Sequence, residues 1–192
     1  MPSDLLPRGT GRVVLRRLEL ADLARFQAYR RDPEVGEFQG WEPQPDDEAA
    51  RFIDDMSHME LFTRGAWVQL GIADRHTDEL MGDVGICVSA DGEKAEIGFT
   101  VAPSAQGSGL GTEAVREVIG LIFDHTDVNS VVAVIDARNV RAHRLAQRAG
   151  FHKLESLSTV FRGEPCIENV WAISRADTTT GAKKPTAIDG VP

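Results

Sequence analysis

The sequence predicts a single domain of mixed α/β class, with a twisted, mostly antiparallel sheet of six to seven strands and helices on both faces. Three observations lead to this prediction. Three short segments of alternating apolar residues follow one another with only polar turns between them, which is typical of an antiparallel meander. A glycine-rich loop and an amphipathic segment then precede a β-branched run that is typical of a buried strand. Finally, Arg162-Gly163-Glu164-Pro165 separates two further strand-like segments and predicts a closing hairpin.

The first half of the chain is expected to hold a strand, two helices and the meander. The first helix carries apolar residues at near-helical spacing and ends at Asp32-Pro33, because proline cannot continue the helical hydrogen bonding. The second helix has its large apolar residues on one face. In order, the elements are a strand over 12–17, helices over 21–31 and 46–62, and strands over 66–73, 80–88 and 94–101.

The second half continues the same alternation of helix and strand. Its elements are helices over 112–125 and 140–149 and strands over 130–136, 152–161 and 166–173. Gly150 follows the second of these helices and is a good C-terminal cap. Beyond Ser174 the chain is polar and contains two prolines, which predicts a flexible tail. We therefore expect an N-terminal arm over 1–11, one domain over 12–174 and a C-terminal tail over 175–192.

Composition agrees with one soluble domain. The chain has 192 residues, of which 42% are hydrophobic, enough to bury a sizeable single core. No apolar run approaches a membrane span and the N-terminus lacks the features of a secretory signal, so a cytoplasmic protein is expected. The two cysteines, Cys87 and Cys166, form neither a disulfide framework nor a metal-ligand spacing, and the five histidines are not paired at ligand spacing. We expect no metal.

The negative charge is concentrated between Asp32 and Glu60. This segment holds ten acids and one base, Arg51, and so accounts for the whole net charge of −9. Such a surface is a poor partner for nucleic acid, which needs clustered Lys and Arg. It would raise the local concentration of a cationic amine. The alternative is that these acids are a solvated helix face and its N-terminal turn.

The stretch Gln106-Gly107-Ser108-Gly109-Leu110-Gly111 places three glycines at alternate positions just before an amphipathic helix. Glycine lets backbone N–H groups turn inward without a Cβ, and the helix start adds unpaired amides and a positive dipole end, so the loop suits a pyrophosphate. It lacks the Gly-Lys-Ser/Thr ending of a P-loop, and its glycine spacing differs from the dinucleotide fingerprint. Taken alone, the loop is also compatible with a turn that binds nothing.

The surroundings of this loop resemble the GNAT acyltransferase superfamily, whose signature is Gln/Arg-x-x-Gly-x-Gly/Ala between a central strand and a helix. Gln106, Gly109 and Gly111 occupy those three positions. Upstream, AEIGFTVAP is similar to the fourth strand of that superfamily. Downstream, VVAVIDARN and VRAHRLAQRAGF resemble its fifth strand, an asparagine and the next helix. The N-terminal LRRLELADLARFQAYRRDPEV, with WVQLGIAD and ELMGDVGI, resembles the branch of the RimJ and RimL ribosomal-protein N-acetyltransferases.

The resemblance implies acetyl-CoA as the cofactor and an N-acetyltransferase activity. In the family the fourth and fifth strands splay apart, and the pantetheine arm pairs with the freed edge. By resemblance, the main chain of Phe99, Thr100 and Val101 makes these contacts and Asn139 hydrogen-bonds the arm. The expected pyrophosphate-binding residues are Gln106, Gly107, Ser108, Gly109, Leu110, Gly111 and Thr112.

Acetyl transfer by direct attack of a neutral amine needs a group that takes the proton of the ammonium. Glu96 is the candidate, since relatives carry a glutamate proposed as base in this strand; the alternative is a cross-strand pairing residue. The sequence departs from the family at the group that would protonate the leaving thiolate. Many members place a tyrosine where this chain has Ala146, and the RimJ/RimL branch has a serine where it has Ala142. Because both side chains are missing, a second hypothesis stays open: a weak or inactive acyl-CoA-binding regulatory or interaction domain.

The acceptor is expected to be an amine. Glu37 and Trp41 lie in the loop where relatives form one wall of the acceptor pocket, and an aromatic face beside a carboxylate suits an ammonium. The alternative is that Trp41 plugs the core. A protein N-terminus, a polyamine, an aminoglycoside and other small cationic amines all remain open, as does a homodimer. Neither nucleic acid nor a membrane is an expected partner.

Overall fold

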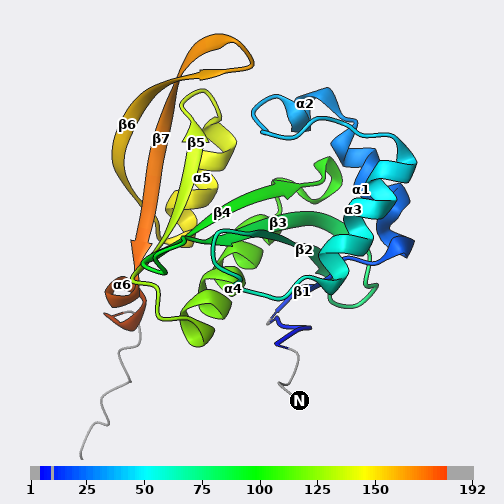
Figure 1. Ribbon diagram of the computed structural model, residues 1–192, viewed down its shortest axis with the longest axis horizontal. Helices are drawn as coiled ribbons and strands as arrows, with labels where there is room; N and C mark the ends of the chain where they lie inside the picture. Colours follow the sequence, from blue (N-terminus) through cyan, green and yellow to red (C-terminus); the bar gives the residue numbers. More distant parts are fainter. Residues whose placement is uncertain (1–4, 10, 181–192) are drawn as a thin grey trace, which may run out of the picture.

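The computed structural model describes residues 5–9 and 11–180, which form one seven-stranded sheet flanked by helices (Figure 1). The strand order is β1-β2-β3-β4-β5-β7-β6. The strands are β1 Val13–Arg17, β2 Trp67–Asp74, β3 Leu80–Val88, β4 Lys94–Val101, β5 Ser130–Asp136, β6 His152–Phe161 and β7 Glu164–Ser174. All neighbouring pairs are antiparallel except β4 with β5. The predicted fold class, meander and closing hairpin are confirmed.

The helices lie on both faces of the sheet. They are α1 Leu23–Arg30, α2 Pro33–Gly36, α3 Asp46–His58, α4 Leu110–His125, α5 Val140–Ala149 and α6 Arg175–Thr180, with short 3₁₀ turns at Leu20–Asp22 and Pro103–Ala105. α4 packs against α5, β1 and β4, whereas α1 and α3 pack against each other and against β3 and β2. No helix among the described residues has the length and apolar character that a membrane span requires.

Alternation of side chains along the strands divides the interior into two cores. Val84 and Ile86 of β3 and Ile97 of β4 point to the α4 face and are buried with α4 residues such as Val118. On the other face a smaller core lies under α1 and α3. Its buried members are Leu18, Phe26, Tyr29, Ala49, Ile53, Leu80 and Ala102. The helix layers therefore cover opposite faces of the same strands.

The strands β4 and β5 are paired over a short stretch only. Their register runs from Lys94↔Ser130 to Glu96↔Val132 and then stops. Beyond that point β4 stays paired with β3 up to Val101, and β5 stays paired with β7 up to Asp136. The two central strands thus diverge after Glu96, as Figure 1 shows, and one edge of β4 is left without a neighbouring strand.

The structure differs from the sequence prediction in two helical segments. A short helix, α2, follows α1 directly, because Pro33 occupies its first turn and the Asp32 carboxylate accepts the Glu34 N–H at 2.9 Å. The helix expected over 46–62 ends at His58. The segment after Met59 includes Phe62 with φ of +63°, which a helix cannot accommodate.

Parts of the expected arm and of the expected tail contact the domain. The first part of the expected tail forms α6, and the Arg175 guanidinium donates to the carbonyls of Phe123, Thr126 and Val128 at 2.5–3.2 Å. In the expected arm, Arg8 pairs with Leu15 through main-chain hydrogen bonds of 2.7 and 2.9 Å. Residues 181–192, the rest of the tail, lie outside the described part of the chain.

Candidate active site

Along the open edge of β4, every second residue points its backbone N–H and C=O groups away from β3. Ser89 N–H donates to the Lys94 carbonyl and Ala102 N–H donates to the Met81 carbonyl, so the even-numbered residues of β4 are hydrogen-bonded to β3. The N–H and C=O groups of Phe99 and Val101 consequently point to the open side. Of the three predicted main-chain contacts, these two lie on the free edge, whereas the main chain of Thr100 faces β3.

Two glutamine side chains donate hydrogen bonds to backbone carbonyls on this edge. Gln39 Nε2, from the loop between α2 and α3, donates to the Phe99 carbonyl at 3.3 Å. Gln106 Nε2 donates to the Val101 carbonyl at 2.9 Å, and Gln106 Oε1 accepts from Arg141 Nη1 at 3.0 Å. The side chain of Gln106 therefore braces the glycine-rich loop against β4 and α5.

The glycine-rich loop leads directly into the N-terminus of α4. Gly107 and Gly109 have φ of +75° and +86°, a conformation that strains any residue with a Cβ, and Gly109 is the N-cap of the helix. Within residues 5–9 and 11–180, none of the N–H groups from Gly107 to Thr112 donates to a protein acceptor. Free amides at the start of a 16-residue helix fit a pyrophosphate.

Gly111 has a different role from the other glycines of the loop. A Cβ at this position would lie 2.9 Å from Leu145 Cδ1 and 3.0 Å from Val101 Cγ2. Because Gly111 has no Cβ, α4 can approach β4 and α5 closely. Arg12, which the sequence analysis did not single out, donates to the Ser108 carbonyl at 3.2 Å and helps to line a pocket of about 310 Å³ beside Gly109 and Thr112.

Asn139 lies at the opposite wall of the gap, after β5. Its Oδ1 accepts the Ala142 N–H at 3.0 Å and so caps α5. This leaves its side-chain N–H₂ group without a partner among the described residues. On the same helix, His143 Nδ1 accepts from Trp171 Nε1 at 3.0 Å, which packs the histidine against β7.

Glu96 lies at the point where β4 and β5 separate, on the sheet face that α1 covers. It pairs across the sheet with Cys87 of β3 and Val132 of β5. Burial raises the pKa of the half-buried Glu96 carboxyl; Lys94 lowers it and the charge of Glu168 raises it further. A raised pKa makes this carboxylate a better proton acceptor near neutral pH.

Cys87 is the cross-strand partner of Glu96 on β3. Burial and, after it, the charge of Glu96 raise the pKa of the Cys87 thiol. The thiol therefore stays protonated, and a protonated thiol is a poor nucleophile. Among the described residues no cluster of three or more His, Cys, Asp and Glu side chains has the arrangement of a metal site.

Trp41 packs on the guanidinium of Arg30, whose Cζ lies 4.5 Å from the centre of the indole ring. Arg30 Nη2 donates to Asp83 Oδ1 at 2.9 Å, and Tyr29 donates to Asp83 Oδ2 at 2.5 Å. Asp83 is fully buried, with 0% of its surface exposed. One face of the Trp41 ring is thus occupied by Arg30. The only tyrosine of the chain is buried on Asp83, and burial raises its pKa well above the usual value.

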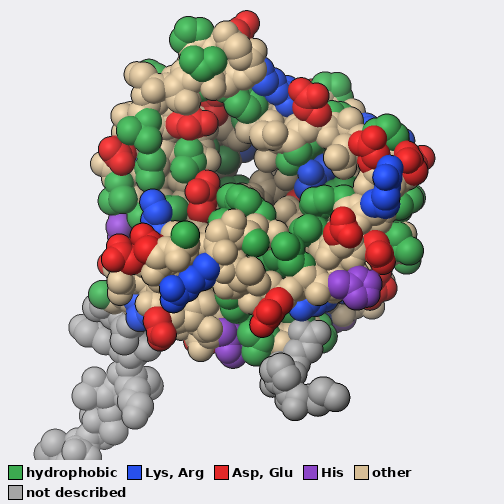
Figure 2. Space-filling view, viewed as in Figure 1, with side chains coloured by type: hydrophobic (Ala, Val, Ile, Leu, Met, Phe, Trp, Pro, Cys, Tyr) green, Lys and Arg blue, Asp and Glu red, His purple; other side chains and the backbone are tan. Residues whose placement is uncertain are grey.

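The loop that holds Glu37 and Trp41 is tied to the far half of the molecule. Arg162, in the β6–β7 turn, donates to the carbonyls of Gly36, Gln39 and Trp41, each at 3.3 Å. Arg138, after β5, lies 5.4 Å from the ring of Phe38. These contacts bridge the hollow between the β5–β7 half and the α1–α3 half, which is visible in Figure 2.

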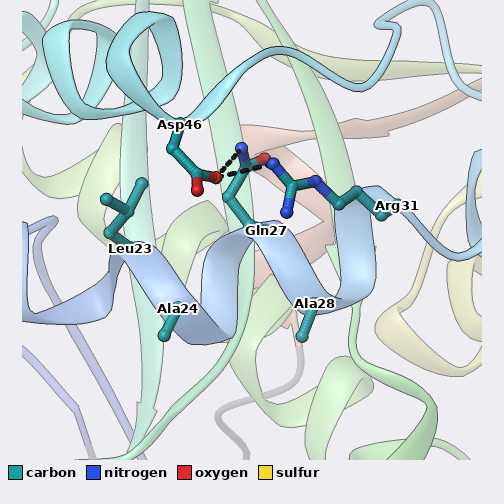
Figure 3. Close-up of a pocket in the computed structure, with 6 residues that line it drawn as sticks. All are labelled: Leu23, Ala24, Gln27, Ala28, Arg31 and Asp46. Atoms are coloured by element: carbon teal, nitrogen blue, oxygen red, sulfur yellow. Dashed lines mark hydrogen bonds and ion pairs between the residues drawn. The ribbon is translucent and has the colours of Figure 1, made fainter.

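Several acids of the segment from Asp32 to Glu60 serve local structure. Asp46 accepts from Gln27 and Arg31, and these two partners lower its pKa. Figure 3 shows them around a depression of about 380 Å³ between α1 and the start of α3. Because their polar groups already satisfy one another and the β4 edge contributes nothing to its walls, this depression is not the active site.

The comparisons with known proteins agree with this geometry. The family model described as an acetyltransferase (GNAT) domain matches residues 12–152. An uncharacterized N-acetyltransferase, p20 of Bacillus licheniformis, is 29% identical over 145 residues, which are 75% of this chain and 81% of that protein.

Two solved structures share the fold. RimL, a ribosomal-protein alpha-N-acetyltransferase solved with coenzyme A, aligns with a TM-score of 0.75 at 15% identity over 88% of this chain and 97% of its own. A spermidine N-acetyltransferase from Vibrio cholerae, solved with CoA and spermine, aligns with a TM-score of 0.75 at 19% identity over 88% and 99%. The resemblance drawn from the sequence motifs is confirmed: the chain belongs to the GNAT family and is an acetyl-CoA-dependent N-acetyltransferase.

Proposed function

We propose that this enzyme transfers the acetyl group of acetyl-CoA to a primary amine, which attacks directly while both substrates are bound. The observation on which this proposal depends is the coincidence of three features where β4 and β5 part. They are a free strand edge at Phe99 and Val101, the unpaired amides before α4, and the half-buried Glu96.

The chain's own groups would hold the cofactor at both ends. The N–H groups from Gly107 to Thr112 bind the pyrophosphate, and the edge of β4 accepts the pantetheine arm as an added strand. Gln39 has to release the Phe99 carbonyl for that pairing. Asn139 donates its free N–H₂ group from the other wall. When bound, acetyl-CoA supplies an acyl group already activated as a thioester.

Glu96 takes the proton of the acceptor ammonium, directly or through a water molecule, and so frees the lone pair that attacks. The protonated thiol of Cys87 argues against an acetylated cysteine on the path. Ala146 and Ala142 offer no acid, and Tyr29 is committed to Asp83. Water is then the group that protonates the leaving thiolate.

The acceptor is a cationic amine, whose local concentration the excess of acids between Asp32 and Glu60 would raise. Trp41 offers the acceptor only the ring face that Arg30 leaves free. Protein N-termini, polyamines, aminoglycosides and smaller amines are all candidates. The solved relatives named for a ribosomal protein and for spermidine fit two of these classes.

The test is to incubate the purified protein with acetyl-CoA and a panel of these amines while free thiol is followed. We expect thiol release that depends on both the protein and an amine. Cofactor binding by calorimetry without thiol release from any amine would contradict the proposal. That result would instead support the acyl-CoA-binding regulatory domain as this chain's role.

A further inference from the structure

The sheet face that carries Glu96 forms two parallel rows of residues across β2, β3 and β4. One row is Trp67, Cys87 and Glu96, which are direct cross-strand partners. The next row is Gln69, Gly85 and Gly98. Cross-strand partners project from the same face, so Trp67 and Glu96 share the face that α1 partly covers.

Gly85 makes room for the ring of Trp67. A Cβ on Gly85 would lie 3.1 and 3.2 Å from two ring carbons of Trp67 and 2.9 Å from Gln69 Oε1. The indole therefore lies close over the β3 backbone instead of standing away from it. It is nevertheless 45% exposed, so part of this large aromatic surface remains open to solvent.

Gly98 is exposed although it lies in the middle strand of the seven. Nothing lies within 4 Å of a Cβ built on it, and its backbone is not in the left-handed region. An unfilled position beside Glu96, at the start of the β4–β5 gap, is where an attacking amine would need space.

We propose that Trp67 is a specificity-determining residue that binds a second positive charge of the acceptor, while Gly98 leaves the path for the reacting amine. This inference rests on the proposed function. Trp67 and Glu96 are two strands apart, roughly 10 Å at the usual strand spacing. An elongated amine with one ammonium at Glu96 and a second on the indole face fits this separation, because aromatic faces attract cations.

The test measures kcat/KM for α,ω-diamines of increasing length and for monoamines of matched length. The wild-type enzyme should favour a long diamine over the matched monoamine. Trp67→Ala should raise the KM of the long diamine by about 3- to 30-fold, the size of a cation–π contact, with kcat and the Kd of coenzyme A unchanged. Trp67→Phe should recover part of the loss. Leu20→Ala, which also removes an exposed apolar side chain, is the matched control.

Gly98→Ala and Gly98→Val give a second measurement that a folding defect cannot imitate, since the position has space for a side chain. Both should melt like the wild-type protein and lose activity in order of side-chain size. A wild-type enzyme that acetylates amines but prefers no diamine, or a Trp67→Ala variant with unchanged KM values, would overturn this inference and leave the proposed function standing. Absence of turnover with every amine would overturn both.

Discussion

The cofactor side and the acceptor side of this active site are built in different ways. The amides that we propose to hold the pyrophosphate come from one continuous segment, in which Gly107 and Gly109 have positive φ angles. The proposed acceptor side is assembled from distant parts of the chain: Glu96 from β4, Trp67 from β2 and Trp41 from a loop held by Arg162. A short motif can encode the first, whereas the second depends on how the whole domain packs. Four substitutions should separate the two sides.

The largest effect is expected at Glu96. Glu96→Gln should lower kcat by about 10²- to 10⁴-fold, because the amide cannot accept the ammonium proton. Since burial raises the pKa of this carboxyl, the wild-type rate should rise with pH through a midpoint above the usual carboxyl range, and the variant should lack this rise. A pH–rate profile measures both. Glu93→Gln, in the exposed turn before β4, is the control, and equal profiles for the Glu96 variant and wild type would remove Glu96 from the mechanism.

The next effect concerns the stability of the acceptor side. Asp83→Asn should lower the free energy of unfolding by about 3–5 kcal/mol, because it leaves the buried guanidinium of Arg30 without its counter-charge. Urea denaturation measures this loss. The control Asp127→Asn, on an exposed loop, should change the free energy of unfolding little. An Asp83 variant as stable as wild type would mean that Asp83 does not hold α1 on the sheet.

A smaller effect is expected on the cofactor side. Gly109→Ala should raise the Kd of coenzyme A by about 5- to 30-fold, since the free loop would relax out of the left-handed conformation and binding would have to restore it at a cost of about 1–2 kcal/mol. Isothermal calorimetry measures this change. Gly40→Ala is the control, because that glycine has open space and an ordinary φ. Equal losses in both variants would argue against a specific role of the loop.

The smallest effect is expected at Arg162. Arg162→Ala removes three hydrogen bonds at an exposed site, so the KM of the acceptor should rise only about 2- to 5-fold. The Kd of coenzyme A should not rise, because Gln39 of this loop has to leave the Phe99 carbonyl when the cofactor binds. Lys153→Ala, an exposed cation on β6, is the comparison in steady-state kinetics. A weaker cofactor affinity in the Arg162 variant would show that the loop it holds belongs to the cofactor side.

The same difference explains what the sequence could predict. The strand over 130–136 and the helix over 140–149 with Gly150 as its cap were predictable to the residue, because local pattern and capping specify them. The role of Gly111 was not, since its close neighbours Val101 and Leu145 come from other elements. The contacts of Arg162 and the burial of Asp83 likewise join residues more than 50 positions apart. Contacts between residues so far apart leave no periodic pattern in the local sequence from which they could be predicted.

The most direct test of the account uses the backbone amides of the glycines. In ¹⁵N-correlated NMR spectra, saturating coenzyme A should shift the amide resonances of Gly107, Gly109 and Gly111, and leave that of Gly163 in the β6–β7 turn unchanged. A compound that retains the pantetheine arm but lacks the pyrophosphate should not shift the first three. Unmoved resonances of Gly107 and Gly109 at saturation would contradict the claim that these amides hold the cofactor.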